Sequence, residues 1–211
     1  IDVPVTLVWV VALTNSTNFL DNMDGLAAGI AAIAAGFFLL IALTQGQGLV
    51  ILLAAAILGS AVGFLAYNFA PSSTFMGDMG ALTLGFLLAV LAIKLTFANH
   101  PLSVSWMVPV LVLAVPIFDI NLVVWTRLSE GRSPVEAGRD HISHRLRDRG
   151  FPTRNVLFVI YLMCVLFGAL GLVVSVAPSA VARWIGLVSV MLLLMLFALM
   201  WWVRLRYQLD T

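Results

Sequence analysis

Carboxylates and amides border long apolar runs at several places in this 211-residue chain. In the stretch NSTNFLDNMDG, the polar residues Asn15, Asn18, Asp21 and Asp24 recur at every third position. Residues three apart share a helix face, so Asp21 and Asp24 can converge on one ligand, whereas a straight helix would turn Asn15 away from Asp24. A solvated loop between two apolar segments is the alternative, and the spacing alone favours neither interpretation.

A second acid stands at the start of an apolar run in NFAPSSTFMGDMGALTLGF, residues 68–86. Asp78 lies here between Gly77 and Gly80, where the first backbone N–H groups of a helix point outward. This arrangement suits a hydrated Mg²⁺ that bridges substrate phosphates, because Mg²⁺ keeps water and takes few carboxylates. An ordinary glycine-rich connector is the alternative, and the spacing alone favours it.

A basic loop, residues 127–154, holds seven of the eleven lysines and arginines. Residues 133–136 (SPVE) form a capping box that predicts a helix start. A helix from there would place His141, His144 and Arg145 on one face, where they could bind phosphate oxygens. A basic loop that only sets topology and touches anionic lipid is the alternative. That alternative explains the arginines but not two histidines at helical spacing.

Asp119, in the stretch VPIFDI, lies inside an apolar run. An acid within a membrane span normally faces the interior of the bundle or a cavity. Asp119 could be catalytic, or it could accept hydrogen bonds from a nearby loop backbone, and we slightly favour the structural role. Cys164 is the only cysteine, which excludes a disulfide framework. The sequence contains no zinc-ligand spacing, P-loop or dinucleotide fingerprint, and so short a basic loop gives no case for nucleic-acid binding.

The elements that must position these residues are membrane helices. Hydrophobic residues make up 62% of the chain and charged residues only 10%, a composition typical of integral membrane proteins. Six stretches approach the length of a span: Leu26–Leu43, Leu49–Tyr67, Ala81–Ala98, Val104–Trp125, Val156–Val176 and Trp184–Val203. Residues 3–13 are too short and predict a truncated helix. The chain starts without methionine, so we expect a fragment of a longer protein that lacks N-terminal spans. The expected fold is an all-α, polytopic transmembrane helix bundle in one membrane domain, residues 1–211.

The basic loop also predicts the orientation of the bundle. By the positive-inside rule, residues 127–154 are cytoplasmic. Counting spans outward puts residues 14–25, residues 69–80 and the C-terminal tail on the same side. The acids, the histidines and most arginines are therefore expected at one cytoplasmic face.

Together these stretches resemble the polyprenyl-phosphate N-acetylhexosamine-1-phosphate transferases, in particular the undecaprenyl-phosphate N-acetylglucosaminyl-1-phosphate transferase branch. The matching motifs are NSTNFLDNMDGLAAG, NFAPSSTFMGDMGALTLGF, VPIFDI and GRSPVEAGRDHISHRL, in the family's order. The resemblance implies a multi-pass enzyme of the bacterial inner membrane that starts cell-envelope glycan synthesis. Its members transfer N-acetylhexosamine 1-phosphate, here most simply GlcNAc 1-phosphate, from a UDP-sugar to polyprenyl phosphate and release UMP.

The same resemblance implies roles for individual residues. Asp78 would be the ligand of Mg²⁺ or Mn²⁺. The catalytic residues would be Asp21, Asp24, His141 and His144, and the substrate-binding residues would be Asn18, Asn68, Arg139 and Arg145. Asp119 and Asn15 remain without a definite role. The expected partners are the UDP-sugar, the polyprenyl phosphate and the membrane, while a homodimer is left open.

Three departures from the family pattern stand out. No Asp-Asp pair occurs in the chain, so the fragment alone is expected to lack part of its site. Ser143 stands where the family usually has a third histidine, and Asn22 stands where many members have glycine. Two alternatives are weaker: PIFD and GRSP resemble the simple-sugar branch more than the phospho-N-acetylmuramoyl-pentapeptide transferases, and the one-sided polar groups argue against a transporter or a non-catalytic membrane protein.

Overall fold

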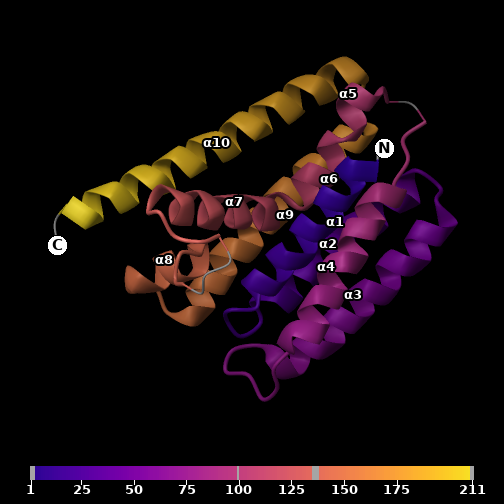
Figure 1. Cartoon of the computed structure of the whole chain (residues 1–211). Coiled ribbons are helices and arrows are strands. Elements are labelled where there is room, and N and C mark those ends of the chain that lie inside the picture. The colour runs from indigo at the N-terminus through magenta and orange to yellow at the C-terminus, as the bar shows by residue number, and fades with distance from the viewer. Residues whose placement is uncertain (1–2, 99, 135–137, 210–211) are drawn as a thin grey trace.

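The computed structural model describes residues 3–98, 100–134 and 138–209, and every regular element within them is a helix (Figure 1). In chain order these are α1 (Val3–Leu20), α2 (Leu26–Thr44), α3 (Gly48–Asn68), α4 (Gly77–Lys94), α5 (Leu102–Ser105), α6 (Met107–Val112), α7 (Ala114–Ser129), α8 (Ile142–Asp148), α9 (Thr153–Val176) and α10 (Ser179–Leu209). Helices α1 to α4, α9 and α10 are long and apolar enough to cross a membrane. The prediction of an all-α, polytopic membrane bundle is confirmed.

The first helix is longer than the sequence predicts. Residues 3–13 were expected to be too short to span, but α1 has 18 residues and ends at Leu20. Two of its polar residues are accommodated because their side chains bond to the helix itself. Asn15 and Thr17 donate hydrogen bonds to carbonyls one turn earlier, at 2.8 and 3.0 Å. The connection to α2 is thereby reduced to residues 21–25.

The span predicted over residues 104–125 is not one straight helix. The α5–α6 segment is bent by 79° against α7, and the break falls at Leu113. Pro116, in the first turn of α7, has no N–H to donate to the Val112 carbonyl, and its ring crowds that carbonyl. One straight helix cannot pass this point. The bend turns α7, which carries Asp119, toward the basic loop.

Small residues allow the helices around the site to approach closely. The buried face of α2 is rich in alanine and glycine, and α2 packs against α3 and α9. Helix α1 packs against α4, where a Cβ added to Gly85 would lie 2.8 Å from the Thr14 Cα atom. This contact brings the first turn of α4, with Asp78, beside the end of α1.

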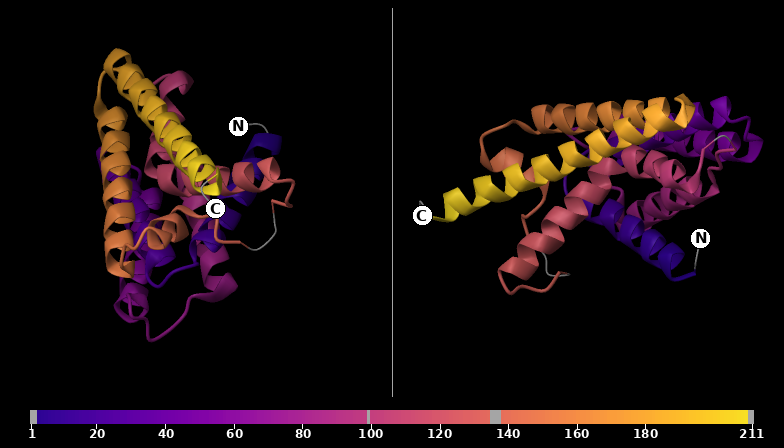
Figure 2. Two further views of the ribbon diagram at one scale, coloured as in Figure 1. Left: turned by 90° about the vertical axis from the view of Figure 1, so that its left-hand side faces the viewer. Right: turned by 90° about the horizontal axis from the view of Figure 1, so that it is seen from above.

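Long-range polar contacts gather at the two ends of the bundle. At one end, residues 21–25, residues 69–76 and α8 hydrogen-bond to one another or to neighbouring helix ends. At the other end, the Gln47 side chain exchanges hydrogen bonds of 2.6 and 3.2 Å with the Thr96 backbone. Figures 1 and 2 show that α10 starts at this second end, crosses the bundle and extends beyond the other helices toward the C-terminus.

Candidate active site

Carboxylates and amides meet where α1 and α3 end and α2 and α4 begin. Asp78 accepts a hydrogen bond of 3.0 Å from the Asn18 side-chain amide. Asp24 accepts one of 3.1 Å from the backbone N–H of Ser72. A cavity of about 190 Å³ is lined by Asp21, Asn22, Met23, Asp24, Asn68 and Phe75. We call Asn18, Asp21, Asp24, Asn68 and Asp78 the acid cluster.

Negative charge is crowded within the acid cluster. Burial raises the pKa of Asp21 to about 6, and the charges of Asp78 and Asp24 add to the rise. A hydrogen bond from the Gly77 backbone lowers the pKa and only partly offsets these effects. Asp21 therefore interacts with both neighbouring acids, although residues 21–25 do not form the helix that the spacing suggested.

Gly25 holds the loop between α1 and α2 in shape. Its φ of 79° lies in the left-handed region, which glycine adopts without strain. Its N–H donates to the Asn68 side-chain carbonyl at 3.0 Å, and its carbonyl accepts a hydrogen bond of 2.5 Å from the Tyr161 hydroxyl. Tyr161 lies directly over Gly29, where an added Cβ would come within 2.0 Å of the hydroxyl oxygen. Asn68 thus anchors the loop rather than only facing a ligand.

The histidine motif is fixed by Asp119. One carboxylate oxygen lies 2.7 Å from Nδ1 of His141, and the other accepts the Ile142 backbone N–H at 2.9 Å. A carboxylate accepts hydrogen bonds, so His141 carries its proton on Nδ1 and leaves Nε2 for a ligand. Asp119 therefore does accept a loop backbone hydrogen bond, as predicted. We call Asp119, His141 and His144 the histidine cluster.

His144 is the more accessible imidazole of the pair, and its ring centroid lies 6.1 Å from that of His141. The pKa of His144 is lowered, first by burial and then by His141 and Arg139. Asp148 and Asp119 act in the opposite direction. The lowered pKa favours a neutral ring near pH 7, which can donate or accept a hydrogen bond.

The helix predicted to begin at the capping box does not run through the histidines. Of the box, residues 135 and 136 lie outside the described residues, residues 138–141 are not helical, and α8 begins at Ile142. Arg145 consequently turns away from the imidazoles. Its guanidinium donates to the Asp140 carbonyl and to the Thr126 hydroxyl, each at 2.8 Å. The expected shared face of His141, His144 and Arg145 is therefore wrong for Arg145.

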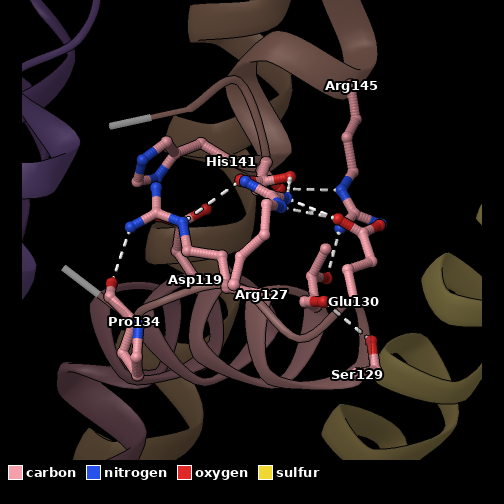
Figure 3. A network of polar contacts seen from close by, with 10 residues as sticks. Asp119, Arg127, Ser129, Glu130, Pro134, His141 and Arg145 are labelled. Atoms are coloured by element: carbon pink, nitrogen blue, oxygen red, sulfur yellow. Dashed lines mark hydrogen bonds and ion pairs between the residues drawn. The ribbon is translucent and has the colours of Figure 1, made fainter. Parts of the chain in front are cut away.

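Ion pairs to the buried Asp140 carboxylate hold the basic loop against α7 (Figure 3). Arg127 binds the Asp140 carboxylate at 3.2 Å and the Pro134 carbonyl at 2.7 Å. Arg132 binds the second oxygen of Asp140 at 2.9 Å. Because Asp140 directly precedes His141, this network fixes the backbone from which the imidazole projects.

A hydrogen bond joins the two chain segments that carry residues of the acid and histidine clusters. The Ser143 hydroxyl donates to the Asn22 side-chain carbonyl at 2.8 Å. The ring of Phe19 supports the same junction, since its centroid lies 6.1 Å from that of His141. Asn22 and Ser143 are two of the departures from the family pattern, and in the folded chain they bind each other.

Two candidate residues lie apart from both clusters. Asn15 is exposed and bonds to its own helix, as the geometry of a straight helix predicts. Arg139 is exposed and forms an ion pair of 2.9 Å with Asp148. The sequence does not indicate a role for Tyr161, because this residue lies in an apolar span. The only related signal is that Gly29, which has no side chain, follows Gly25 by four residues and leaves room for a large side chain.

A divalent cation of the magnesium type fits the acid cluster. Within the described residues, no group of three or more histidine, cysteine, aspartate or glutamate side chains is arranged to hold a metal ion. A complete cage of protein ligands is therefore not formed there. Mg²⁺ needs only one or two carboxylates besides water and substrate phosphates. Asp21, whose pKa is raised by burial and further by the charge of Asp78, offers that smaller set together with Asp78.

Fold and site together define a polytopic membrane protein with acids and histidines joined at one end of its bundle. Within this class, residues 1–96 match the sequence model of glycosyl transferase family 4. This match to residues 1–96 confirms the resemblance drawn from the motifs.

Curated relatives extend the similarity beyond that segment. A probable undecaprenyl-phosphate N-acetylglucosaminyl 1-phosphate transferase of Bacillus subtilis is 34% identical over 90% of this chain and 52% of its own length. A decaprenyl-phosphate N-acetylglucosaminephosphotransferase of Mycobacterium leprae is 34% identical over 78% of this chain and 46% of its own length. A phospho-N-acetylmuramoyl-pentapeptide-transferase of Lactiplantibacillus plantarum is 45% identical, but over 46% of this chain and 29% of its own length. The chain spans about half the length of the first two relatives.

Proposed function

We propose that this protein transfers N-acetylglucosamine 1-phosphate from UDP-N-acetylglucosamine to a polyprenyl phosphate and releases UMP. The observation that carries the proposal is the junction of the acid and histidine clusters at one end of a membrane bundle. The chain is also similar over nine tenths of its length to a relative named for this activity.

The membrane setting suits these two substrates. The phosphate of a polyprenyl phosphate lies at the membrane surface, and a UDP-sugar is water-soluble. A site at the end of a helix bundle can meet both. The basic residues of the loop at this end favour the cytoplasmic side, where the positive-inside rule puts them.

In the proposed step, an oxygen of the polyprenyl phosphate forms a bond to the sugar-bearing phosphorus of the UDP-sugar. The bond between that phosphorus and the bridging oxygen of UMP breaks, and UMP leaves with the electron pair. Both reactants are anions, so their approach must be made favourable electrostatically. A bound Mg²⁺ would supply positive charge to the phosphate oxygens.

The two acids of the first loop take different roles in this proposal. The charge of Asp78 acts on Asp21, so these two carboxylates would hold the cation. Asp24 accepts the Ser72 N–H and holds residues 69–76, the loop that leads into α4. Asn18 orients Asp78 through its amide.

The histidine cluster binds the diphosphate. Asp119 fixes His141 so that Nε2 is the nitrogen available to a phosphate oxygen. His144 adds a hydrogen bond from a ring whose lowered pKa favours the neutral form. Arg139 is an exposed cation of this loop, and it can exchange Asp148 for a phosphate.

A transfer assay tests this function. Membranes with the full-length protein are given UDP-N-acetylglucosamine, undecaprenyl phosphate and Mg²⁺, and UMP and lipid-linked sugar are measured. We expect both products in equal amounts. Absence of a lipid product with every UDP-hexosamine tried would refute the proposal.

A phospho-N-acetylmuramoyl-pentapeptide transferase is the second candidate, favoured by the 45% identity to such an enzyme over 97 residues. The same assay with UDP-N-acetylmuramoyl-pentapeptide decides between the two.

The cytoplasmic orientation is tested with Ser133→Cys, because Ser133 is exposed and the native Cys164 is buried. Labelling of this variant from outside intact cells would contradict the proposed side.

A further inference from the structure

We propose that the hydrogen bond between Ser143 and Asn22 sets the spacing of the acid and histidine clusters, which makes both residues positioning residues of the transfer reaction. The inference rests on the proposed function. It gives a role to the Ser143 and Asn22 side chains, which bind neither the cation nor the diphosphate in the proposed function.

The bond has a fixed direction at both of its ends. Ser143 is fully buried on α8, and its hydroxyl donates to the Asn22 side-chain carbonyl at 2.8 Å. The amide nitrogen of Asn22 donates to the Phe19 carbonyl at 2.7 Å, which holds the side chain in one orientation. A buried hydroxyl or amide that lost its partner would destabilise the structure, so the pair favours one relative placement of α8 and the loop.

The bond connects two segments that carry the proposed reactive groups. Asn22 lies next to Asp21 and lines the cavity with it. Ser143 stands between His141 and His144 in the chain, so movement of Ser143 moves both imidazoles. A displacement of about 1 Å between reacting groups can lower the rate on the order of 10²-fold.

The helix that carries Ser143 depends on such anchors. Helix α8 has seven residues, too few to be stable without tertiary contacts. Asp119 holds its first N–H and Arg145 holds it to Thr126, and both anchors lead to α7. The bond to Asn22 leads instead to the loop between α1 and α2. It therefore ties α8 to the loop that carries Asp21, whereas the other two anchors tie α8 to α7.

A double-mutant cycle on the full-length protein tests the link. We expect Ser143→Ala and Asn22→Ala each to lower kcat about tenfold, with KM for the UDP-sugar changed far less, because the link orders groups for the reaction rather than for binding. The double variant should be no slower than the slower single variant. Ser143→Thr keeps the hydroxyl and should restore most of the rate.

Ser189→Ala is the matched control. Ser189 is as buried as Ser143, but its hydroxyl donates to the Ile185 carbonyl within its own helix. Its replacement should leave kcat unchanged. Thermal unfolding in detergent is measured for every variant, so that a general loss of structure is recognised.

The outcomes separate the two proposals. Additive losses in the double variant, or a Ser143→Ala kcat equal to that of Ser189→Ala, would overturn the link while an active wild type upholds the transferase. If the wild-type protein forms no lipid-linked sugar, the proposed function fails and the positioning role falls with it. Coupling in kcat, with rescue by Ser143→Thr, supports both.

Discussion

Asp21 borders a cavity and is partly exposed, and Asp78 is exposed, whereas Asp119 and Asp140 are buried beside the histidine motif. On the acid side, burial raises the pKa of Asp21 to about 6, and the negative charges of Asp78 and Asp24 contribute to the rise. On the histidine side, Asp119 has an imidazole and a backbone N–H as partners, and Asp140 has two arginines.

This difference indicates how the two clusters divide the work. Crowded negative charge is costly unless a cation relieves it, so the acid cluster is suited to a ligand that brings positive charge. In the histidine cluster, Asp119 already has two partners, and it therefore presents the His141 imidazole in a fixed orientation. The acid cluster is therefore suited to be completed by a cationic ligand, whereas His141 of the histidine cluster is oriented before a ligand binds.

Removing Asp78 should give the largest effect. Asp78→Asn removes one of two carboxylates proposed to hold the cation, and we expect kcat to fall on the order of 10²–10³-fold. A titration of activity with Mg²⁺ should show that added metal does not restore the rate. Asp24→Asn is the control, because an asparagine oxygen can still accept the Ser72 N–H. Near-normal turnover of Asp78→Asn would remove Asp78 from the metal role.

The next effect concerns the buried side of the comparison. In Asp119→Asn, the amide group can turn its nitrogen toward His141 and force the proton to Nε2. We expect a fall in kcat of about 10- to 100-fold, as for other residues that orient a functional histidine. Nitrogen-15 spectra of labelled histidine should report the changed tautomer. An unchanged spectrum with unchanged kcat would show that Asp119 does not organise His141.

The sequence predicts which end of the bundle carries the site because helix parity and charge are local properties. Asp78 is found in the first turn of α4, as its flanking glycines indicate. Asn18, in the last turn of α1, and Asp21, just after α1, lie at the same end of the bundle. Pro116 indicates that the helix is interrupted there, but the size of the bend depends on how α6 and α7 pack. Local pattern alone could not tell a kink from a break.

Side-chain direction was the least predictable feature. Arg145 has helical spacing to His141, but α8 begins only one residue after His141. The guanidinium therefore binds the Asp140 carbonyl and the Thr126 hydroxyl of α7 instead of facing the imidazole. Tyr161 belongs to a span whose pattern indicates only apolar packing. Its bond to Gly25 joins residues 136 positions apart, and no local signal encodes such a contact.

Tyr161→Phe tests how far the acid cluster depends on α9. The change removes the hydroxyl that binds the Gly25 carbonyl, and we expect a loss of about 1 kcal/mol in the free energy of unfolding and a fall of a few fold in kcat. The Asp119–His141 contact should be unaffected, so the histidine tautomer should not change. Tyr67→Phe, at an exposed tyrosine of α3, is the control. Loss of the tautomer signal in Tyr161→Phe would show that the two clusters are not separately organised.

The smallest expected effect is on the titration of His144. Arg139 lowers the pKa of His144 by repelling the protonated ring, and Asp148 raises it by attracting that ring. Arg139→Gln should therefore raise the pKa, and Asp148→Asn should lower it further, as measured by NMR titration of the ring. The two residues form an exposed ion pair, so solvent screens both effects. Shifts of the same sign in both variants would contradict direct charge interactions and would instead indicate that breaking the pair moves α8. That result would place the rigidity of the histidine cluster in the surface pair rather than in Asp119.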